Sequence, residues 1–120
     1  MQKILIIGAG AMGSAFSIPC LENKNDVSLI GTFLENDLIK SLKEKNNYHP
    51  ALDINLPKHL NIERHDQLGK LIQDEVDVIV AGISSIGIEW FAKEISKFYK
   101  KKTSIILLTK GLAVENDHLI

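Results

Sequence analysis

The chain has 120 residues, of which 45% are hydrophobic and 24% charged, and its formal net charge at pH 7 is -1. This length suits one compact domain, which buries roughly two-thirds of the surface that its unfolded form exposes. The near-zero charge excludes a strong positive field for nucleic acid or an anionic membrane, so any anion must be held by local geometry. A single cysteine, Cys20, excludes an internal disulfide and suits a reducing cytoplasm. The apolar run near the N-terminus is too short for a signal peptide or a membrane span.

Apolar segments typical of buried strands alternate along the chain with apolar residues at helical spacing. The predicted strands cover residues 4–7, 27–30, 61–64, 76–81 and 104–108. The first four predicted helices are carried by Met12, Ala15, Phe16 and Cys20, by Leu34, Leu38 and Leu42, by Leu68, Leu71 and Ile72, and by Ile88, Phe91, Ile95 and Phe98. Asp66 is the predicted N-cap of the third helix, and a fifth helix is predicted from Glu115 onward.

This alternation predicts an α/β fold with a Rossmann-type, doubly wound parallel sheet flanked by helices, because parallel strands need right-handed crossovers. No repeat or linker divides residues 1–120, so we expect one domain. Residues 46–60 contain two prolines and show no periodicity, which predicts a long connection of the kind that is often functional. Ligands in such sheets bind at the carboxyl ends of the strands, which here are the turns at 8–13, 31–33, 82–85 and 109–111.

Gly8, Gly10 and Gly13 form a G-x-G-x-x-G pattern between the first strand and the first helix. Gly8 permits the tight turn, Gly10 lets a pyrophosphate approach the backbone, and Gly13 lets the helix pack close to the sheet. The helix N-terminus adds unpaired N–H groups and the positive end of its dipole. The alternative is a glycine turn that holds no nucleotide. The strand, glycines and helix in register favour a dinucleotide, NAD or NADP.

The turns after the second and fifth strands hold the other candidate residues. A NAD-binding domain often has an acidic residue for the adenosine ribose after its second strand, but here the chain reads Gly31-Thr32-Phe33. Thr32 could hydrogen-bond a ribose hydroxyl or a 2′-phosphate, so NAD and NADP both stay open. We interpret Glu35 as a first-turn residue favoured by the helix dipole. Lys110 is a candidate anion contact, with a solvated lysine as the alternative. The four histidines lack metal-type spacing, so we expect no metal site.

Four segments carry a family resemblance, and they are GAGAMGSAFS at 8–17, HPALDINLP at 49–57, GISSIGI at 82–88 and LTKGL at 108–112. Together they resemble the NAD(P)-dependent glycerol-3-phosphate dehydrogenase family, along essentially the whole chain and in the right order. The first segment is shared with ketopantoate reductases and the wider 6-phosphogluconate dehydrogenase-like group. The second and fourth segments discriminate better.

The resemblance implies reversible hydride transfer between NAD or NADP and C2 of dihydroxyacetone phosphate or sn-glycerol 3-phosphate, which are phosphorylated trioses. It implies that Ala11 and Met12 line the pyrophosphate turn, that Thr32 lies by the adenosine ribose, and that Lys110 contacts substrate and cofactor. The family's acid/base lysine, its companion asparagine and its phosphate-binding arginine lie in a second, helical domain. We therefore expect no catalytic residue within 1–120 and no turnover by this truncated Rossmann domain alone. A homodimer is open for the full-length protein.

Two alternatives compete with this interpretation. One is a ketopantoate-reductase-like NADPH enzyme, which shares the glycine turn. The other is a stand-alone module that binds NAD(P) without chemistry, and chain length is the feature that favours it.

Overall fold

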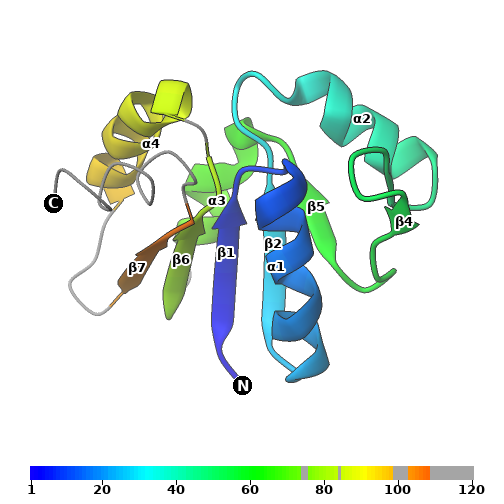
Figure 1. Cartoon of the computed structure of the whole chain (residues 1–120). Coiled ribbons are helices and arrows are strands. Elements are labelled where there is room, and N and C mark those ends of the chain that lie inside the picture. The colour runs from blue at the N-terminus through cyan, green and yellow to red at the C-terminus, as the bar shows by residue number, and fades with distance from the viewer. Residues whose placement is uncertain (74–75, 84, 99–102, 109–120) are drawn as a thin grey trace, which may run out of the picture.

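The structure of the chain is a computed structural model, and it describes residues 1–73, 76–83, 85–98 and 103–108. A five-stranded parallel sheet carries helices on both faces, and a two-stranded antiparallel sheet accompanies it (Figure 1). The strands are β1 (Lys3–Ile7), β2 (Asp26–Ile30), β3 (Tyr48–His49), β4 (Ile54–Asn55), β5 (Asn61–Glu63), β6 (Val78–Ala81) and β7 (Ser104–Leu107). The helices are α1 (Ala11–Glu22), α2 (Asn36–Glu44), the 3-10 helix η1 (His65–Gln67), α3 (Leu68–Ile72) and α4 (Ser85–Phe98). Within the described residues, no helix has the length and apolar character needed to cross a membrane.

The strand order of the large sheet is β5-β2-β1-β6-β7, which confirms the predicted doubly wound arrangement. β1 lies in the centre, with Ile7 paired to Ile30 of β2 on one side and to Ala81 of β6 on the other. The chain first extends the sheet through β2 and β5, and then returns to add β6 and β7 on the opposite side of β1 (Figure 1). The strand order therefore reverses at β1, and ligands of such sheets bind beyond the carboxyl end of the strands at this point.

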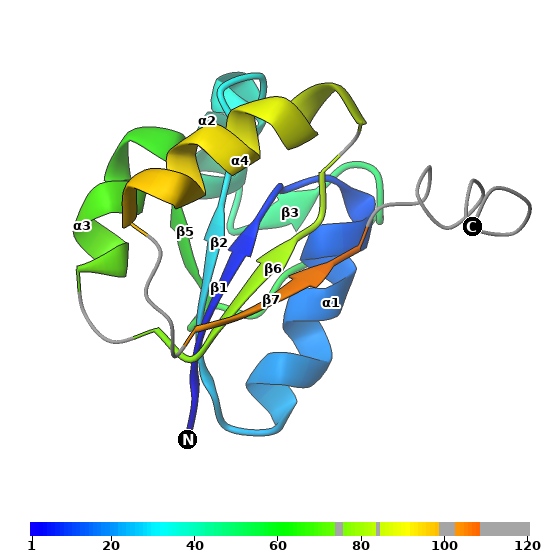
Figure 2. The same cartoon turned by 90° about the vertical axis from the view of Figure 1, so that its left-hand side faces the viewer.

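Both faces of β1 are buried, which explains the continuous apolar run in its sequence. Ile4 and Ile6 pack with residues of α1 and α2 on one face, whereas Leu5 and Ile7 pack with residues of α3 and α4 on the other. All four side chains are at most 5% exposed. Figure 2 shows these layers, with α3 and α4 on one side of the sheet and α1 on the other. Burial on both faces fixes β1 and with it the turn that follows.

Helix α1 contacts the sheet through small residues, so the buried face predicted from its larger side chains is partly wrong. Gly13, Ser14 and Ser17 are buried, whereas Met12 and Ala15 are exposed. Small side chains let the helix approach the strands closely, and this close packing outweighs the burial of larger groups. The two serine hydroxyls donate to backbone carbonyl oxygens at 3.0 and 2.6 Å, so neither is left unsatisfied by burial.

Residues 46–60 were predicted as an irregular connection, but they contain the antiparallel pair of β3 and β4. In this hairpin Tyr48 pairs with Asn55 and His49 with Ile54. Each strand has only two residues, which is too few for an alternating pattern to be visible in the sequence. The hairpin buries the side chain of His49, which is 1% exposed.

The third helix begins later than its predicted cap. Asp66 lies inside η1, and Gln67 precedes α3 without a side-chain capping bond, so the assignment of Asp66 as N-cap is wrong. The chain closes a tighter turn first, in which the N–H of Gln67 donates to the carbonyl of Arg64 at 3.0 Å. The apolar spacing of Leu68 and Ile72 still identified the buried face correctly.

Strand β7 is more exposed than its apolar sequence suggests. Ile105, Ile106 and Leu107 are 42%, 43% and 51% exposed. In the described part of the sheet β7 pairs with β6 on one side and forms the edge. An apolar cavity of about 570 Å³ lies between β7 and α4. A strand's place in a sheet depends on its neighbours, and its own sequence does not reveal it.

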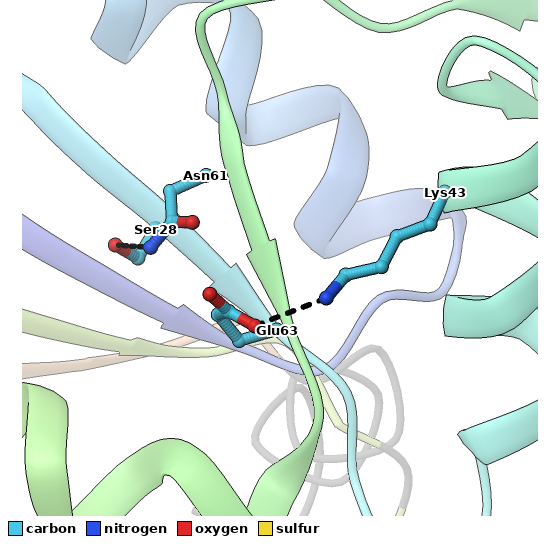
Figure 3. Close-up of polar contacts among 4 residues, drawn as sticks. All are labelled: Ser28, Lys43, Asn61 and Glu63. Atoms are coloured by element: carbon cyan, nitrogen blue, oxygen red, sulfur yellow. Dashed lines mark hydrogen bonds and ion pairs between the residues drawn. The ribbon is translucent and has the colours of Figure 1, made fainter.

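Polar side chains attach the short strand β5 to the elements beside it (Figure 3). Asn61 donates from Nδ2 to Oγ of Ser28 on β2 at 3.1 Å. Lys43 of α2 forms an ion pair of 3.1 Å with Glu63. The side chain of Lys43 is 51% exposed, so this pair contributes at most about 1 kcal/mol to stability.

Candidate functional site

The turns after β1, β2 and β6 meet at the carboxyl edge of the sheet. Backbone bonds join them, since the N–H of Gly8 donates to the carbonyl of Ile30 at 2.7 Å and that of Gly82 to Ile7 at 2.8 Å. A cavity of about 210 Å³ opens here. Residues of all three turns and of α4 line it, namely Gly10, Thr32, Leu34, Glu35, Gly82, Ile83 and Gly87. Three of the four predicted ligand turns therefore border one cavity, and the fourth, 109–111, lies outside the described residues.

Three glycines pack against one another beneath this cavity. Gly8 has a φ of 111°, and a Cβ placed on it would lie 2.2 Å from the carbonyl oxygen of Gly82. A Cβ on Gly13 would lie 2.2 Å from the carbonyl oxygen of Gly8, and one on Gly82 would lie 2.9 Å from Cα of Gly13. Side chains at these positions would force β1, α1 and β6 apart. The contact explains the first and third glycines of the motif, and it adds Gly82, which the sequence pattern placed in a ligand turn without this packing role.

Gly10 differs from these three glycines because open space surrounds it. Apart from its chain neighbours, the nearest atom to an added Cβ is Oε2 of Glu35, at 3.9 Å. Gly10 is the N-cap of α1, and the first bond of the helix runs from the N–H of Ser14 to the Gly10 carbonyl at 3.0 Å. No side chain caps this end, and its first turn contains no acidic residue. The first N–H groups of α1, from Ala11 and Met12 onward, thus border a space that suits an anion such as a diphosphate.

Ala9, the residue before this end, is held by three hydrogen bonds. Its N–H donates to Oε1 of Glu35 at 2.9 Å. Its carbonyl oxygen accepts hydrogen bonds from Nε2 of His49 at 2.7 Å and from Oγ of Ser14 at 3.0 Å. The glycine turn is therefore fixed by residues of α1, of the turn after β2 and of the β3–β4 hairpin. Fixed geometry lowers the entropy lost when a ligand binds.

Glu35 has a different position from the one predicted. It is the N-cap residue of α2, whose first-turn acidic residue is Asp37. Its carboxylate turns back to the glycine turn, where Oε1 accepts from the N–H groups of Ala9 and Thr32, both at 2.9 Å. The interpretation of Glu35 as a dipole residue was therefore wrong. Its distance along the chain from the glycine motif, about 20 residues, was the available signal.

Thr32 and Lys110 are the remaining predicted site residues. Thr32 is 6% exposed and lines the cavity, and its Oγ1 accepts a hydrogen bond from the N–H of Leu34 at 3.3 Å. Lys110 lies outside the described residues. Trp90 lies on α4, with its ring centroid 5.7 Å from that of Phe33 and 6.1 Å from that of His65.

Comparisons with known proteins agree with this geometry. The sequence model of the family described as NAD-dependent glycerol-3-phosphate dehydrogenase N-terminus matches residues 3–120. An NADP(+)-dependent glycerol-3-phosphate dehydrogenase of Archaeoglobus fulgidus is 35% identical over 109 residues, which cover 91% of this chain and 31% of that protein. A 2-dehydropantoate 2-reductase of Lactococcus lactis is 26% identical over 118 residues, which cover 96% of this chain and 36% of that protein.

The fold also matches a solved structure. A glycerol-3-phosphate dehydrogenase of Coxiella burnetii has a TM-score of 0.75 at 21% identity, over 91% of this chain and 32% of that one. This chain thus spans about a third of the length of the proteins it matches. Since the family's sequence model covers residues 3–120, the chain belongs to the NAD-dependent glycerol-3-phosphate dehydrogenase family and corresponds to its N-terminal part.

Proposed function

We propose that this chain is the cofactor-binding domain of an oxidoreductase that transfers hydride between NAD(P)H and dihydroxyacetone phosphate or sn-glycerol 3-phosphate. The observation that carries the proposal is the N-terminus of α1, whose N-cap residue is Gly10 and whose N–H groups no side chain caps. This helix end lies beyond β1, the strand at which the strand order reverses. Family membership supplies the class of reaction. The relative from A. fulgidus is named for this activity.

Each residue of the glycine turn has a separate task in the proposal. The free N–H groups at the start of α1 would hold the diphosphate, with the positive end of the helix dipole behind them. The glycines that pack against one another would keep the turn close to the sheet, and Thr32 would lie by the adenosine ribose. The residues assigned to the cofactor are Gly8, Gly10, Ala11, Met12, Gly13, Thr32 and Lys110.

Lys110 is the proposed contact to the substrate. When bound, the nicotinamide supplies or accepts the hydride. A cation beside the substrate oxygen would stabilise the negative charge that develops there as the carbonyl is reduced. The proposal assigns acid/base catalysis to residues beyond 1–120, so this domain alone should bind a dinucleotide without turning substrate over.

The test is an assay of a full-length protein that contains this domain, with dihydroxyacetone phosphate and either NADH or NADPH, which follows loss of the reduced nicotinamide. We expect turnover with at least one cofactor, and a Lys110→Ala variant should lose most of it while still binding cofactor. Retention of full activity in that variant would remove Lys110 from the substrate site. Absence of turnover by the complete protein, together with absence of cofactor binding, would overturn the proposal.

A ketopantoate reductase is the second candidate, and the similarity to the L. lactis 2-dehydropantoate 2-reductase favours it. Its identity of 26% is lower than the 35% of the A. fulgidus relative. The same assay separates the two, because oxidation of NADPH by ketopantoate but not by dihydroxyacetone phosphate would select the second candidate.

The proposal also places the protein in the cytoplasm, where the nicotinamide cofactors are abundant and a lone thiol stays reduced. A net charge of -1 supports a small-molecule ligand over nucleic acid. Fractionation of cells that express the protein, with detection in the cytosolic fraction, tests this placement.

A further inference from the structure

Glu35 places a negatively charged carboxylate between the end of β2 and the glycine turn. Its N–H donates to the carbonyl of Thr32 at 3.0 Å, which closes a turn and directs the side chain back towards β1. Oε1 then accepts from the N–H groups of Ala9 and Thr32. In the described part of the chain Oε2 has no hydrogen-bond partner, and it is the atom nearest to the open side of Gly10. One carboxylate oxygen thus builds the turn, and the other is available to a ligand.

Among the described residues, Glu35 is the one charged side chain that lines the cavity at the glycine turn. Its lining residues include no lysine or arginine, and neither does the segment 31–35 that leads into α2. A separate cavity of about 380 Å³ beside α2 and the end of β5 holds the described cations of this region, which are Lys40, Lys43 and Arg64. Lys43 is already paired with Glu63. The described side chains that line the cavity at the glycine turn therefore carry a negative charge, whereas Lys110 lies outside the described residues.

We propose that Glu35 makes this site select NAD over NADP, an inference that rests on the proposed function. A carboxylate oxygen without a partner accepts hydrogen bonds from ribose hydroxyls, as the acidic residue of NAD-binding Rossmann domains does. A 2′-phosphate removes one of these donors and brings a charge of about -1.5 to -2 towards the carboxylate. Sites that accept this phosphate supply a nearby arginine, and segment 31–35 has none. The expected preference is opposite to the cofactor named for the A. fulgidus relative.

Calorimetric titration of the protein with NADH and with NADPH tests this selection without any need for turnover. NADH should bind at least about tenfold more tightly than NADPH, the ratio expected for gaining a charge-assisted bond and avoiding a repulsion. The variant Glu35→Gln keeps an amide oxygen for the N–H groups of Ala9 and Thr32, so the turn and the unfolding midpoint should be preserved. It replaces the free oxygen by a donor and removes the charge. NADH affinity should fall about 3–10-fold, NADPH affinity should rise, and the preference should shrink about tenfold or more.

A matched control is Asp37→Asn, which makes the same change of net charge two residues further along. Asp37 is exposed in the first turn of α2 and does not line the cavity at the glycine turn. The Asp37→Asn variant should keep the ratio of NADH affinity to NADPH affinity within about twofold of the unmodified protein's, because solvent and salt screen the charge of Asp37. Equal shifts in the two variants would overturn the assignment by attributing the selection to net charge.

The other outcomes separate this inference from the function on which it rests. Equal affinity for the two cofactors, or tighter binding of NADPH, would overturn the role of Glu35 while leaving a dinucleotide-binding domain. If Arg64→Ala then abolished NADPH binding, the basic cavity beside α2 would be the phosphate site instead. Binding of neither cofactor would overturn the proposed function and this inference with it.

Discussion

His49 donates a hydrogen bond from Nε2 to the carbonyl oxygen of Ala9 at 2.7 Å, although 40 positions separate the two residues. The N–H of Ala51 donates to the other ring nitrogen, Nδ1, at 3.2 Å. Nδ1 therefore acts as the acceptor, and the neutral ring carries its proton on Nε2. The β3–β4 hairpin thus supports the glycine turn at Ala9, the same residue whose N–H is bound by Glu35.

Removing this support should weaken the site and the fold together. We expect His49→Leu to lower the free energy of unfolding by about 1–3 kcal/mol, because it deletes a buried hydrogen bond. NADH affinity should fall as the turn loses its fixed position. His49→Gln restores a donor of similar reach and should recover most of the affinity. Urea unfolding and calorimetry measure the two effects, and unchanged affinity in the leucine variant would show that the turn does not depend on His49.

Alanine substitutions at Gly13 and Gly10 should separate stability from binding. A Cβ at Gly13 meets the Gly8 carbonyl oxygen at 2.2 Å, so Gly13→Ala should cost about 1–3 kcal/mol or more by forcing α1 from the sheet. Gly10→Ala has open space and a φ of -68°, so its stability should change by less than about 0.5 kcal/mol. Its methyl group would occupy the proposed approach of the diphosphate, and NADH affinity should fall by about tenfold or more.

Thermal unfolding and NADH titration of both variants provide the measurements. Gly10→Ala that binds NADH normally would contradict the assignment of the diphosphate to this turn. Gly13→Ala with an unchanged unfolding midpoint would contradict the close contact of the three glycines.

The central strand should be far less tolerant of truncation than the edge strand. Leu5 is fully buried, and Leu5→Ala should lower the free energy of unfolding by about 2–5 kcal/mol through lost contacts and a residual cavity. Ile105 on β7 is 42% exposed, and Ile105→Ala serves as the matched control with an expected loss of at most about 1 kcal/mol. Similar losses in a urea titration would show that β7 is covered as completely as β1.

Cys20 should react slowly while the protein is folded. Burial raises the pKa of its thiol, so the reactive thiolate is scarcer than in the unfolded chain. Because the folded pKa is the higher one, the stability linked to this group is present below the ordinary thiol pKa and falls as pH rises through the folded value. Alkylation by iodoacetamide at mildly alkaline pH, followed by mass spectrometry, should be slower without urea than with it. Equal rates would show that the thiol is not protected.

Some parts of the site could be predicted because they depend on residues that are neighbours in the chain. Three such parts follow one another directly in the chain, namely the apolar run of β1, the glycine turn and the start of α1. The local sequence of each part was enough to predict its local structure. Alternation of strands and helices then limits the sheet to a doubly wound order, which the arrangement β5-β2-β1-β6-β7 confirms. The apolar face of α1 was less predictable, since close packing through Gly13 and two serines outweighed the larger side chains.

The amino-acid sequence by itself determined the class of fold, the central strand and the turn that begins the first helix, because short-range sterics and apolar periodicity control these features. Tertiary structure alone decided that Glu35 and His49 hold the Ala9 peptide and that Gly82 packs against Gly8. These contacts join residues 26, 40 and 74 positions apart, whose side chains meet only after the sheet has assembled. No periodic pattern marks such pairs, since each is a single contact set by the geometry of the whole fold.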